Sequence, residues 1–466
     1  MSVRFTIIGA GPGGYVAAIR AAQRGARVTV VESQEVGGTC LHWGCIPTKA
    51  IIASVETLDN ARNSSMFGVD VAGTVNYDLA RIRERKDKIV ATQAKGIHAL
   101  FKSHGITLIQ GRGSLLSDDV VRAVQKDGTT QDLRSDRIII ATGSRPARLA
   151  GIEADGDTVL TSDDAVRLTS VPKSLLIIGA GVIGCEFAFI YRSLGSDVTM
   201  IDLAPRALST EDLEISDILE RELKKAKIRL ITGTAPGNVR KTPDGIMTID
   251  LPDGKELKAE KVLLSVGRAM NTEGLRLEDG GVKTGKRNEI VVDGRMETST
   301  PGIFAIGDVT GKMMLAHVAS EQGLVAVENA LGGDTHMDYS AIPAGIFTRP
   351  EIGSVGLREF EAAGRGLSIK VGRFPYRALG KAHVMGELPG IIKIISDAKT
   401  DKVLGMHICG AHATDLVHEG VLAIKMGATA AQLGQMVHAH PTLAEGIREA
   451  AEDVHGMAIH LPRPSK

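Results

Sequence analysis

Short apolar runs that end in glycine recur along this chain. Residues 5–8, 174–178, 138–140 and 263–264 are rich in isoleucine, leucine and phenylalanine, and each run is followed within three residues by glycine. Runs this short, without polar alternation, predict strands buried on both faces of a parallel sheet. The first two runs lead into alanine-rich or apolar helical stretches, so we expect two α/β nucleotide-binding folds. The other two runs should be the strands after which the chain leaves these folds.

The pattern changes near residue 340. Residues 390–395 and 403–409 predict two strands with a different composition, and residues 414–426 predict a helix. The chain should therefore end in a separate α+β domain.

The turn after residues 5–8 has the spacing G-x-G-x-x-G. Gly9 permits the tight turn, Gly11 lets the backbone approach a pyrophosphate at the helix N-terminus, and Gly14 allows close packing of helix on strand. The next predicted strand ends in Glu32, whose carboxylate can accept hydrogen bonds from a ribose. This combination predicts a dinucleotide site.

The same fingerprint recurs at Gly179, Gly181 and Gly184, and the following strand ends in Asp202. A carboxylate there accepts a hydrogen bond from a 2′-hydroxyl and repels a 2′-phosphate, which favours NAD over NADP. Arg206 keeps NADP open as the alternative, because an arginine can bind that phosphate.

Two cysteines, Cys40 and Cys45, follow the first fingerprint closely. A dithiol beside a dinucleotide can exchange electron pairs with it, so the first fold should hold FAD and the second NAD. Five residues of regular helix advance about 7.5 Å, whereas a disulfide requires Cα atoms roughly 4.4–6.8 Å apart. We therefore expect a distorted turn, with Gly44 supplying backbone freedom and Pro47 opening the next helix.

A histidine near the end of the chain is the candidate base. His440 can take a proton from a thiol because histidine changes charge near neutral pH. Pro441 is expected to open a helix, and Glu445, a turn along it, to hold the second ring nitrogen. His438 competes for this role, but its partner is unspecified, so we assign the base to His440.

Composition narrows the class of protein. The 466 residues suggest about three domains, and the equal totals of 55 basic and 55 acidic residues argue against nucleic acid or a membrane surface as partner. Four cysteines are too few for a disulfide framework and suit a reducing compartment. No apolar run reaches the roughly 18 residues of a membrane span, so we expect a cytoplasmic protein, and we expect no metal site.

With these residues in hand, the chain resembles the dihydrolipoamide dehydrogenase family of flavoprotein disulfide reductases over nearly its whole length. The motifs that carry the resemblance lie at 37–49 (Gly-Gly-Thr-Cys-x4-Cys-Ile-Pro-Thr-Lys), 141–146, 179–186, 305–308, 314–317 and 438–445. One departure is His42-Trp43, where members commonly carry Asn-Val. We interpret it as a variation in loop packing; the alternative is that His42 faces the disulfide and tunes the thiolate.

The resemblance implies oxidation of protein-bound dihydrolipoamide, with electrons passing through Cys40 and Cys45 and non-covalent FAD, one per subunit, to NAD. It implies a homodimer in which His440 and Glu445 complete the partner subunit's site. It also implies that the protein binds the lipoyl domains and the acyltransferase or aminomethyl-carrier components of 2-oxo-acid dehydrogenase or glycine cleavage complexes. Lys49 is expected to lie by the flavin and pair with Glu186. The expected domains are 1–146 and 270–338 for FAD, 147–269 for NAD and 339–466 for dimerisation.

The fingerprints and the resemblance together give two sets of cofactor contacts. Those expected for FAD are Gly9, Gly11, Gly13, Gly14, Glu32, Gly38, Thr39, Lys49, Gly113, Thr142, Gly143, Ser144, Gly307, Asp308, Leu315, Ala316 and His317. Those expected for NAD are Gly179, Gly181, Val182, Ile183, Gly184, Glu186, Asp202, Ala235, Val266, Gly267 and Arg268.

Other functions stay open at this point. The chain could be another flavoprotein disulfide reductase, such as a glutathione reductase, although Asp202 disfavours the NADP that such an enzyme should use. A mercuric reductase would need a cysteine pair near its C-terminus, and the last cysteine is Cys409. The chain could also act mainly as a structural subunit of a multienzyme complex.

Overall fold

The computed structural model describes residues 2–167, 169–243 and 245–462. The chain divides into two compact units, which are described separately. The first unit contains Met1–Ala150, Thr161–Ser170 and Val266–Met337, and the second contains Gly151–Leu160, Val171–Ser265 and Asp338–Lys466. Among the described residues, no helix combines the length and the apolar character needed to cross a membrane.

The first unit is built on a 7-stranded sheet with the order β17-β6-β1-β2-β3-β4-β5. The strands from β17 to β3 are parallel, and β4 and β5 continue the sheet as an antiparallel meander. Their bounds are β1 Arg4–Ile8, β2 Arg27–Glu32, β3 Thr107–Leu115, β4 Val120–Gln125, β5 Thr130–Arg134, β6 Arg137–Ile140 and β17 Ile303–Ala305. The predicted strands at residues 5–8 and 138–140 are therefore neighbours, and both are fully buried.

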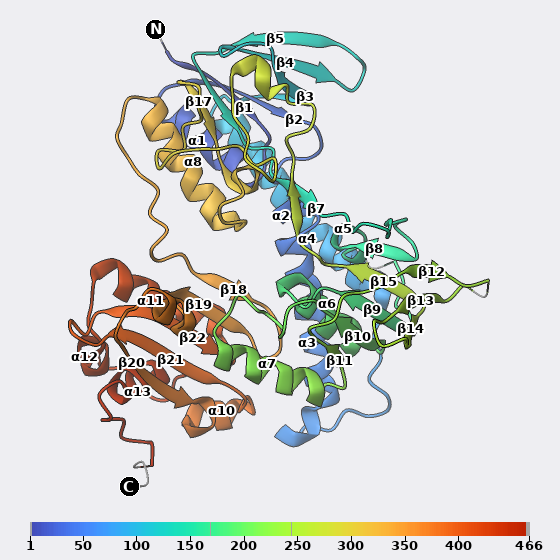
Figure 1. Ribbon diagram of the computed structural model, residues 1–466, viewed down its shortest axis with the longest axis vertical. Coiled ribbons are helices and arrows are strands. Elements are labelled where there is room, and N and C mark those ends of the chain that lie inside the picture. Colours follow the sequence, from blue (N-terminus) through green and yellow to red (C-terminus); the bar gives the residue numbers. More distant parts are fainter. Residues whose placement is uncertain (1, 168, 244, 463–466) are drawn as a thin grey trace. The chain divides into compact units, whose positions relative to one another are not determined.

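Helices α1 and α8 run side by side along this sheet (Figure 1). Their contact is close because glycine stands at both points of approach: a Cβ on Gly13 would lie 2.9 Å from the Ala319 carbonyl oxygen, and one on Gly323 would lie 2.8 Å from that of Gly13. The helices of this unit are α1 Pro12–Gln23, α2 Gly38–His42, α3 Cys45–Arg62, α4 Leu79–Ser103, α5 Ser162–Ala165 and α8 Ala316–Ala330, with short 3-10 turns η1 Ser64–Phe67, η2 Leu277–Gly280 and η3 Gly307–Thr310. Strands β7 Ser144–Pro146 and β16 Arg268–Met270 form an antiparallel ribbon.

The second unit contains a 5-stranded sheet with the order β11-β10-β9-β15-β8, and the pairings from β11 to β15 are parallel. Its strands are β8 Val159–Thr161, β9 Ser174–Ile178, β10 Asp197–Ile201, β11 Arg229–Ile231 and β15 Lys261–Leu264, accompanied by α6 Val182–Ser193 and α7 Leu213–Lys225. A 3-stranded antiparallel sheet, β12 Val239–Lys241, β13 Met247–Asp250 and β14 Glu256–Ala259, is inserted before β15. Both predicted nucleotide-binding folds are therefore present.

The same unit ends in a 5-stranded sheet with the order β18-β19-β22-β21-β20. All its pairings are antiparallel. The elements are β18 Ala344–Ile346, β19 Ile352–Gly356, α9 Glu359–Gly364, β20 Ile369–Pro375, η4 Tyr376–Ala378, α10 Gly380–Met385, β21 Ile391–Asp397, β22 Val403–Cys409, α11 Ala413–Met426, α12 Ala430–Gln435 and α13 Glu445–Asp453. This is the α+β domain predicted from the change of pattern near residue 340.

A row of polar residues crosses this antiparallel sheet. Arg373, Lys393, His407 and Ser354 are cross-strand neighbours on β20, β21, β22 and β19, so their side chains share one face. The Lys393 side chain has no exposed surface, and its Nζ lies 2.7 Å from Oδ1 of Asp212, the N-cap of α7, and also bonds Glu359.

This row fastens the antiparallel sheet to α7. Arg373 adds a second bond to the same helix, with its Nε 2.8 Å from the carboxylate of Glu214. Burial raises the pKa of the Asp212 carboxyl, but the Lys393 charge outweighs burial and the pKa lies below its ordinary value. The stabilisation from this pair is therefore fully present above the ordinary carboxyl pKa and is lost only as pH falls below it.

Both nucleotide folds depend on a crossing of helix over strand that excludes a side chain. A Cβ on Gly14 would lie 2.0 Å from the Gly9 carbonyl oxygen, and a Cβ on Gly184 would lie 2.0 Å from that of Gly179. Gly9 and Gly179 also have positive φ angles, of 102° and 108°, which disfavour other residues. The tight turn at the first glycine and the close packing at the last glycine of each fingerprint are confirmed, whereas the approach of a pyrophosphate to Gly11 and Gly181 stays a prediction.

We predict that Gly184→Ala disrupts the second fold, whereas Gly181→Ala leaves it intact and weakens dinucleotide binding. A methyl group added at position 184 would overlap the backbone of Gly179, but a Cβ on Gly181 meets nothing within 4 Å and projects where a pyrophosphate would approach. Thermal unfolding and NADH titration of both variants check this. A Gly184→Ala protein as stable as Gly181→Ala would contradict it.

We also predict that Lys393→Ala lowers the free energy of unfolding by about 3–5 kcal/mol, because it leaves Asp212 as a buried charge without its partner. Lys425→Ala is the control, since Lys425 pairs with Asp338 at the surface and such pairs contribute at most about 1 kcal/mol. Urea unfolding of both variants measures the difference. An equal loss of unfolding free energy in both variants would show that the buried pair stabilises the fold no more than the surface pair.

Candidate active site

The first fingerprint places the N-terminus of α1 at the end of β1. Gly11 is the N-cap and Pro12 follows at the first helical position. Glu32, at the end of β2, is buried, and its two carboxylate oxygens accept hydrogen bonds from the backbone N–H groups of Ala10 (2.7 Å) and Gln34 (2.8 Å). The acid predicted from sequence is therefore anchored to the fingerprint turn itself.

The segment that leads to the two cysteines contacts the same turn. Gly37 and Gly38 both have positive φ angles, 96° and 57°, and the Gly37 N–H donates to the Ala10 carbonyl. A Cβ on Gly38 would lie 2.7 Å from the Gly11 Cα. Helix α2, which begins at Gly38 and carries Cys40, thus starts in contact with the turn at the N-terminus of α1. This contact explains why the Gly-Gly pair precedes the first cysteine.

The two cysteines lie on different helices. Cys40 is in α2 and Cys45 is the first residue of α3, with Gly44 as the N-cap between them. The predicted break between the cysteines is confirmed. The prediction that Pro47 opens the second helix is wrong by two residues: α3 begins at Cys45, and Pro47 lies in its first turn, where a missing N–H costs no helical hydrogen bond.

The two thiols differ in their electrostatic surroundings. A hydrogen bond with Cys45 and burial raise the pKa of the Cys40 thiol, and the nearby charge of Lys49 only partly opposes them. Cys45 is exposed and occupies the N-terminus of an 18-residue helix, where the helix dipole favours a negative charge. Burial and the hydrogen bond thus favour the protonated form at Cys40, and the helix start favours a negative charge at Cys45.

His42 and Trp43 pack against the loop that contains them. The His42 Nε2 lies 2.9 Å from the Val36 carbonyl oxygen, and its ring stacks at a tilt on Trp43 with centroids 5.2 Å apart. The packing interpretation of this departure from the family is supported by both contacts.

The other two cysteines are not competing nucleophiles. Cys185 in α6 and Cys409 in β22 are fully buried, as predicted. Burial raises the pKa of both thiols, so neither is an accessible thiolate.

Asp308 belongs to a cluster that the sequence did not indicate. Its carboxylate accepts a short hydrogen bond from the Ser144 hydroxyl, and the Arg268 Nε lies 3.7 Å from the same oxygen. Arg268 also donates to the Ser144 hydroxyl (2.6 Å) and carbonyl (2.9 Å). The sequence assigns Arg268 to NAD and the other two to FAD, but the ribbon of β7 and β16 brings all three together. Next to them, Thr142 and Asn271 exchange two hydrogen bonds.

The start of α8 lies beside the start of α1. Leu315 is the N-cap of α8, and Ala316 and His317 follow it. One turn along, the Ser320 hydroxyl is 3.4 Å from the Pro12 carbonyl oxygen. Gly307 has a positive φ of 73°, and its N–H donates to Gln322 on α8.

Three more of the residues predicted to contact a cofactor lie in β3, in the loop after β11 and in α2. Gly113, in β3, is buried, and a Cβ added to it would lie 2.9 Å from Ile8 Cγ2 and 3.4 Å from Val31 Cγ1; its contact with a cofactor stays a prediction. Ala235 is exposed in the loop after β11 and follows Thr234, whose N–H donates to the Asp202 carbonyl. Thr39 is in the first turn of α2.

The second fingerprint repeats the first. Asp202 accepts hydrogen bonds from the N–H groups of Ala180 (2.5 Å) and Ala204 (2.7 Å), as Glu32 does in the first fold. Val182 and Ile183 form the first turn of α6 behind Gly181.

Arg206, the residue that leaves NADP as an alternative in the sequence, already has other hydrogen-bond partners. Its guanidinium donates to the carbonyl oxygens of Leu208, Ser209 and Glu211 and lies over the Phe360 ring, 5.8 Å from the centroid. A 2′-phosphate would compete with three existing bonds, so the arrangement favours NAD.

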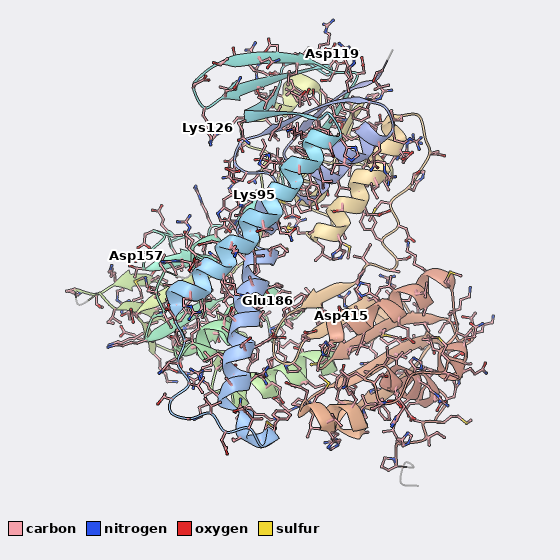
Figure 2. All side chains as sticks on the ribbon, turned by 180° about the vertical axis from the view of Figure 1, so that it is seen from behind. Lys95, Asp119, Lys126, Asp157, Glu186 and Asp415 are labelled. Carbon is pink, nitrogen blue, oxygen red and sulfur yellow. The ribbon has the colours of Figure 1, made fainter. Side chains whose placement is uncertain are left out.

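Glu186 is buried in α6 (Figure 2), and its Oε1 accepts a hydrogen bond from the Phe347 N–H at 3.0 Å. That backbone contact holds the carboxylate in place. Its pairing with Lys49 stays a prediction.

The candidate base has the predicted carboxylate partner. His440 Nδ1 lies 2.8 Å from Glu445 Oε1, and Glu445 Oε2 accepts from the Thr442 N–H at 2.8 Å. Burial of the Glu445 carboxyl raises its pKa, but the Thr442 N–H and the His440 ring outweigh it, and the pKa lies below its ordinary value. Glu445 is thus ionised where His440 has to accept a proton. The expectation that Pro441 opens this helix is wrong: α13 begins at Glu445, and Pro441 lies in the preceding loop.

Exposure separates the two histidines. The His440 side chain is 78% exposed, whereas that of His438 is 6% exposed and is bonded to Glu419 on α11. Of these two histidines, only His440 is accessible to a substrate that comes from outside this unit.

Both fingerprints fit a dinucleotide. A Cβ on Gly11 or Gly181, the N-caps of α1 and α6, would meet nothing within 4 Å, so the space beside each of these glycines is open, and a helix N-terminus binds phosphate. Within the described residues, no group of three or more His, Cys, Asp or Glu side chains is arranged to hold a metal ion.

Known proteins resemble the chain along nearly all of its length. A dihydrolipoyl dehydrogenase of Bacillus subtilis is 44% identical, with 98% of both chains covered, and one of Thermus scotoductus is 42% identical, again with 98% of both covered. Among solved structures, LpdA of Mycobacterium tuberculosis is 30% identical with a TM-score of 0.91 and covers 97% of this chain and 99% of its own. The HOCl-induced flavoprotein disulfide reductase RclA of Escherichia coli is 25% identical with a TM-score of 0.86, over 96% and 99% of the two chains.

Two family models match in succession. Residues 3–323 match the pyridine nucleotide-disulphide oxidoreductase model, and residues 342–451 match the dimerisation domain of the same family. The match includes both fingerprints, both redox cysteines and the His440–Glu445 pair. The chain belongs to the pyridine nucleotide-disulphide oxidoreductases.

Proposed function

We propose that this protein oxidises dihydrolipoamide, carried on a partner protein, and passes the electron pair to NAD. The observation that carries the proposal is a dithiol anchored to one dinucleotide turn, in a chain that also holds a second dinucleotide fold with an Asp202 carboxylate and an exposed His440–Glu445 pair. Near-full-length identity of 40–44% to dihydrolipoyl dehydrogenases supports it.

The cofactors are FAD and NAD. When bound, FAD would supply the two-electron chemistry that links the cysteine dithiol to hydride transfer onto NAD. Gly11, Glu32 and the N-termini of α1 and α8 would hold FAD, and Gly181 with Asp202 would hold NAD. We propose that Asp308 accepts hydrogen bonds from the hydroxyls of the ribityl chain, while Ser144 and Arg268 hold its carboxylate in place. We assign 1–146 and 270–338 to FAD, 147–269 to NAD and 339–466 to dimerisation.

The protein is a homodimer, since residues 342–451 match a dimerisation domain. His440 and Glu445 lie inside that segment. We propose that in each active site the base is His440 of the partner subunit, acting on the Cys40–Cys45 pair of the first subunit.

The residues of the chain then have distinct roles. His440, held through Nδ1 by Glu445, takes a proton from one substrate thiol at Nε2, and the resulting thiolate attacks Cys40 of the Cys40–Cys45 disulfide. The disulfide breaks, and Cys45 leaves as a thiolate stabilised by the start of α3. The second substrate thiol attacks the mixed disulfide, the ring of oxidised lipoamide closes, and Cys40 accepts a proton. One substrate dithiol is oxidised and one protein disulfide is reduced.

The proposed partners follow from the substrate. Dihydrolipoamide is carried on lipoyl domains or on an aminomethyl carrier, so we place the protein in a 2-oxo-acid dehydrogenase or glycine cleavage complex. Which complex it serves, and its cytoplasmic location, stay predictions. The rival activity, reduction of glutathione disulfide with NADPH, is disfavoured by Asp202 and by the bonds that occupy Arg206.

Anaerobic mixing of the FAD-loaded protein with dihydrolipoamide, without NAD, tests the proposal. We expect the Cys40–Cys45 disulfide to be reduced within a catalytic turnover, measured by flavin absorbance and thiol titration. Reduction by glutathione should be much slower. If glutathione reduces the pair as fast as dihydrolipoamide, the substrate assignment fails.

We predict that Cys45→Ser binds FAD but shows no long-wavelength thiolate-to-flavin absorbance on reduction, because the thiolate belongs to Cys45. Cys40→Ser is the matched variant and should keep the band, since the remaining thiol lies at the start of α3. Absorbance spectra under anaerobic titration distinguish them. A band in Cys45→Ser would reverse the two roles.

We predict that His440→Gln slows dihydrolipoamide oxidation by about 10²–10⁴-fold, the usual contribution of a general base. Oxidation of NADH by ferricyanide needs no proton from a dithiol and should be unchanged. Because the pKa of Glu445 is lowered, its carboxylate should stay ionised through the ordinary titration range of a glutamate, and protonation of Glu445 should cause no loss of activity there. Equal loss in both assays would point to a structural defect.

A further inference from the structure

His438 is a second imidazole with a carboxylate partner, two residues before the base. Its Nε2 lies 3.0 Å from Glu419 Oε1, and its Nδ1 lies 3.2 Å from the Met436 carbonyl oxygen. Both ring nitrogens therefore face acceptors. The mechanism above gives this residue no role.

The loop that carries His440 has few other attachments on its N-terminal side. Of residues 436–440, all of which are described, only His438 has a largely buried side chain: Val437 is 94% exposed, and Met436 and Ala439 are also exposed. Helix α12 ends at Gln435, before this loop begins. His438 is thus the side chain that inserts the loop into the domain.

Glu419 offers a rigid attachment point. It lies on α11, next to Gly420, whose Cβ would approach the Met406 Cβ on β22 to 2.8 Å. The buried positions of this helix are Ala413, Val417, Gly420 and Ala423, so its backbone is pressed against the sheet. The Glu419 carboxylate is carried on the flank of this helix and reaches the loop.

We propose that the His438–Glu419 pair is a positioning element for the base. Glu445 fixes the His440 ring from the C-terminal side of the loop, and His438 bonded to Glu419 fixes the loop from the N-terminal side. A base must reach its proton within hydrogen-bond distance, and a displacement of about 1 Å can cost about 100-fold in rate. This inference rests on the proposed function.

The test compares His438→Ala with the wild-type holoenzyme. We expect kcat for dihydrolipoamide to fall by about 10- to 100-fold, with the KM for dihydrolipoamide, the FAD content and the oxidation of NADH by ferricyanide unchanged. His438→Gln, which keeps one donor for Glu419, should recover part of the lost rate. Glu419→Ala should match His438→Ala, and the double variant should be no slower than either, because both remove the same interaction.

His460→Ala is the matched control. His460 also pairs with a glutamate of this domain, Glu449, at 2.7 Å, but its side chain is 69% exposed and lies outside the loop. We expect its kinetics to be unchanged.

The outcomes separate the two proposals. A wild-type protein that does not oxidise dihydrolipoamide refutes the proposed function. An active wild type with an unchanged kcat in His438→Ala and Glu419→Ala refutes the positioning role, as does equal loss in the ferricyanide assay or additive losses in the double variant. If His438→Ala fails to fold as a dimer, Glu419→Ala alone carries the test, and an unchanged kcat in that variant also refutes the proposal.

Discussion

A backbone contact that tolerates no side chain underlies both nucleotide folds. Where α1 crosses β1, and again where α6 crosses β9, a Cβ on the last fingerprint glycine would lie 2.0 Å from a carbonyl oxygen of the first. The crossing aims each helix N-terminus at the end of its strand. The acid of the next strand then bonds back to the turn, Glu32 to Ala10 and Asp202 to Ala180. The geometry of each dinucleotide site follows from this one steric constraint.

The redox chemistry is attached to the first of these turns. A Cβ on Gly38, at the start of α2, would lie 2.7 Å from the Gly11 Cα, so the turn that precedes Cys40 packs directly on the fingerprint turn. The break at Gly44 then places Cys45 at the start of a new, long helix. Two cysteines that look equivalent in sequence thereby have different surroundings, because Cys40 is partly buried and hydrogen-bonded while Cys45 is exposed and begins a helix.

Much of this arrangement could be predicted from the sequence because glycine spacing and apolar runs act locally. The fingerprints, the strands and the His440–Glu445 pair all depend on residues close together in the chain. The helix starts were misplaced at Pro47 and Pro441, because a proline is tolerated anywhere in the first turn or before it.

Contacts between distant segments were missed for a different reason. Arg268 with Ser144 and Asp308, Glu419 with His438, and the buried Lys393 with Asp212 join residues brought together only by sheet order and helix packing. Lys393 alone would be predicted as a surface residue, since lysine is almost never fully buried without partners. Its carboxylate partners lie 181 and 34 positions away.

Steady-state turnover tests the central claim most directly. The holoenzyme should reduce NAD with dihydrolipoamide many times faster than it reduces glutathione disulfide with NADPH, under matched concentrations. Comparable or faster turnover of glutathione disulfide with NADPH would contradict the account, because it would require a 2′-phosphate to be accepted beside Asp202 and a substrate other than dihydrolipoamide at Cys40.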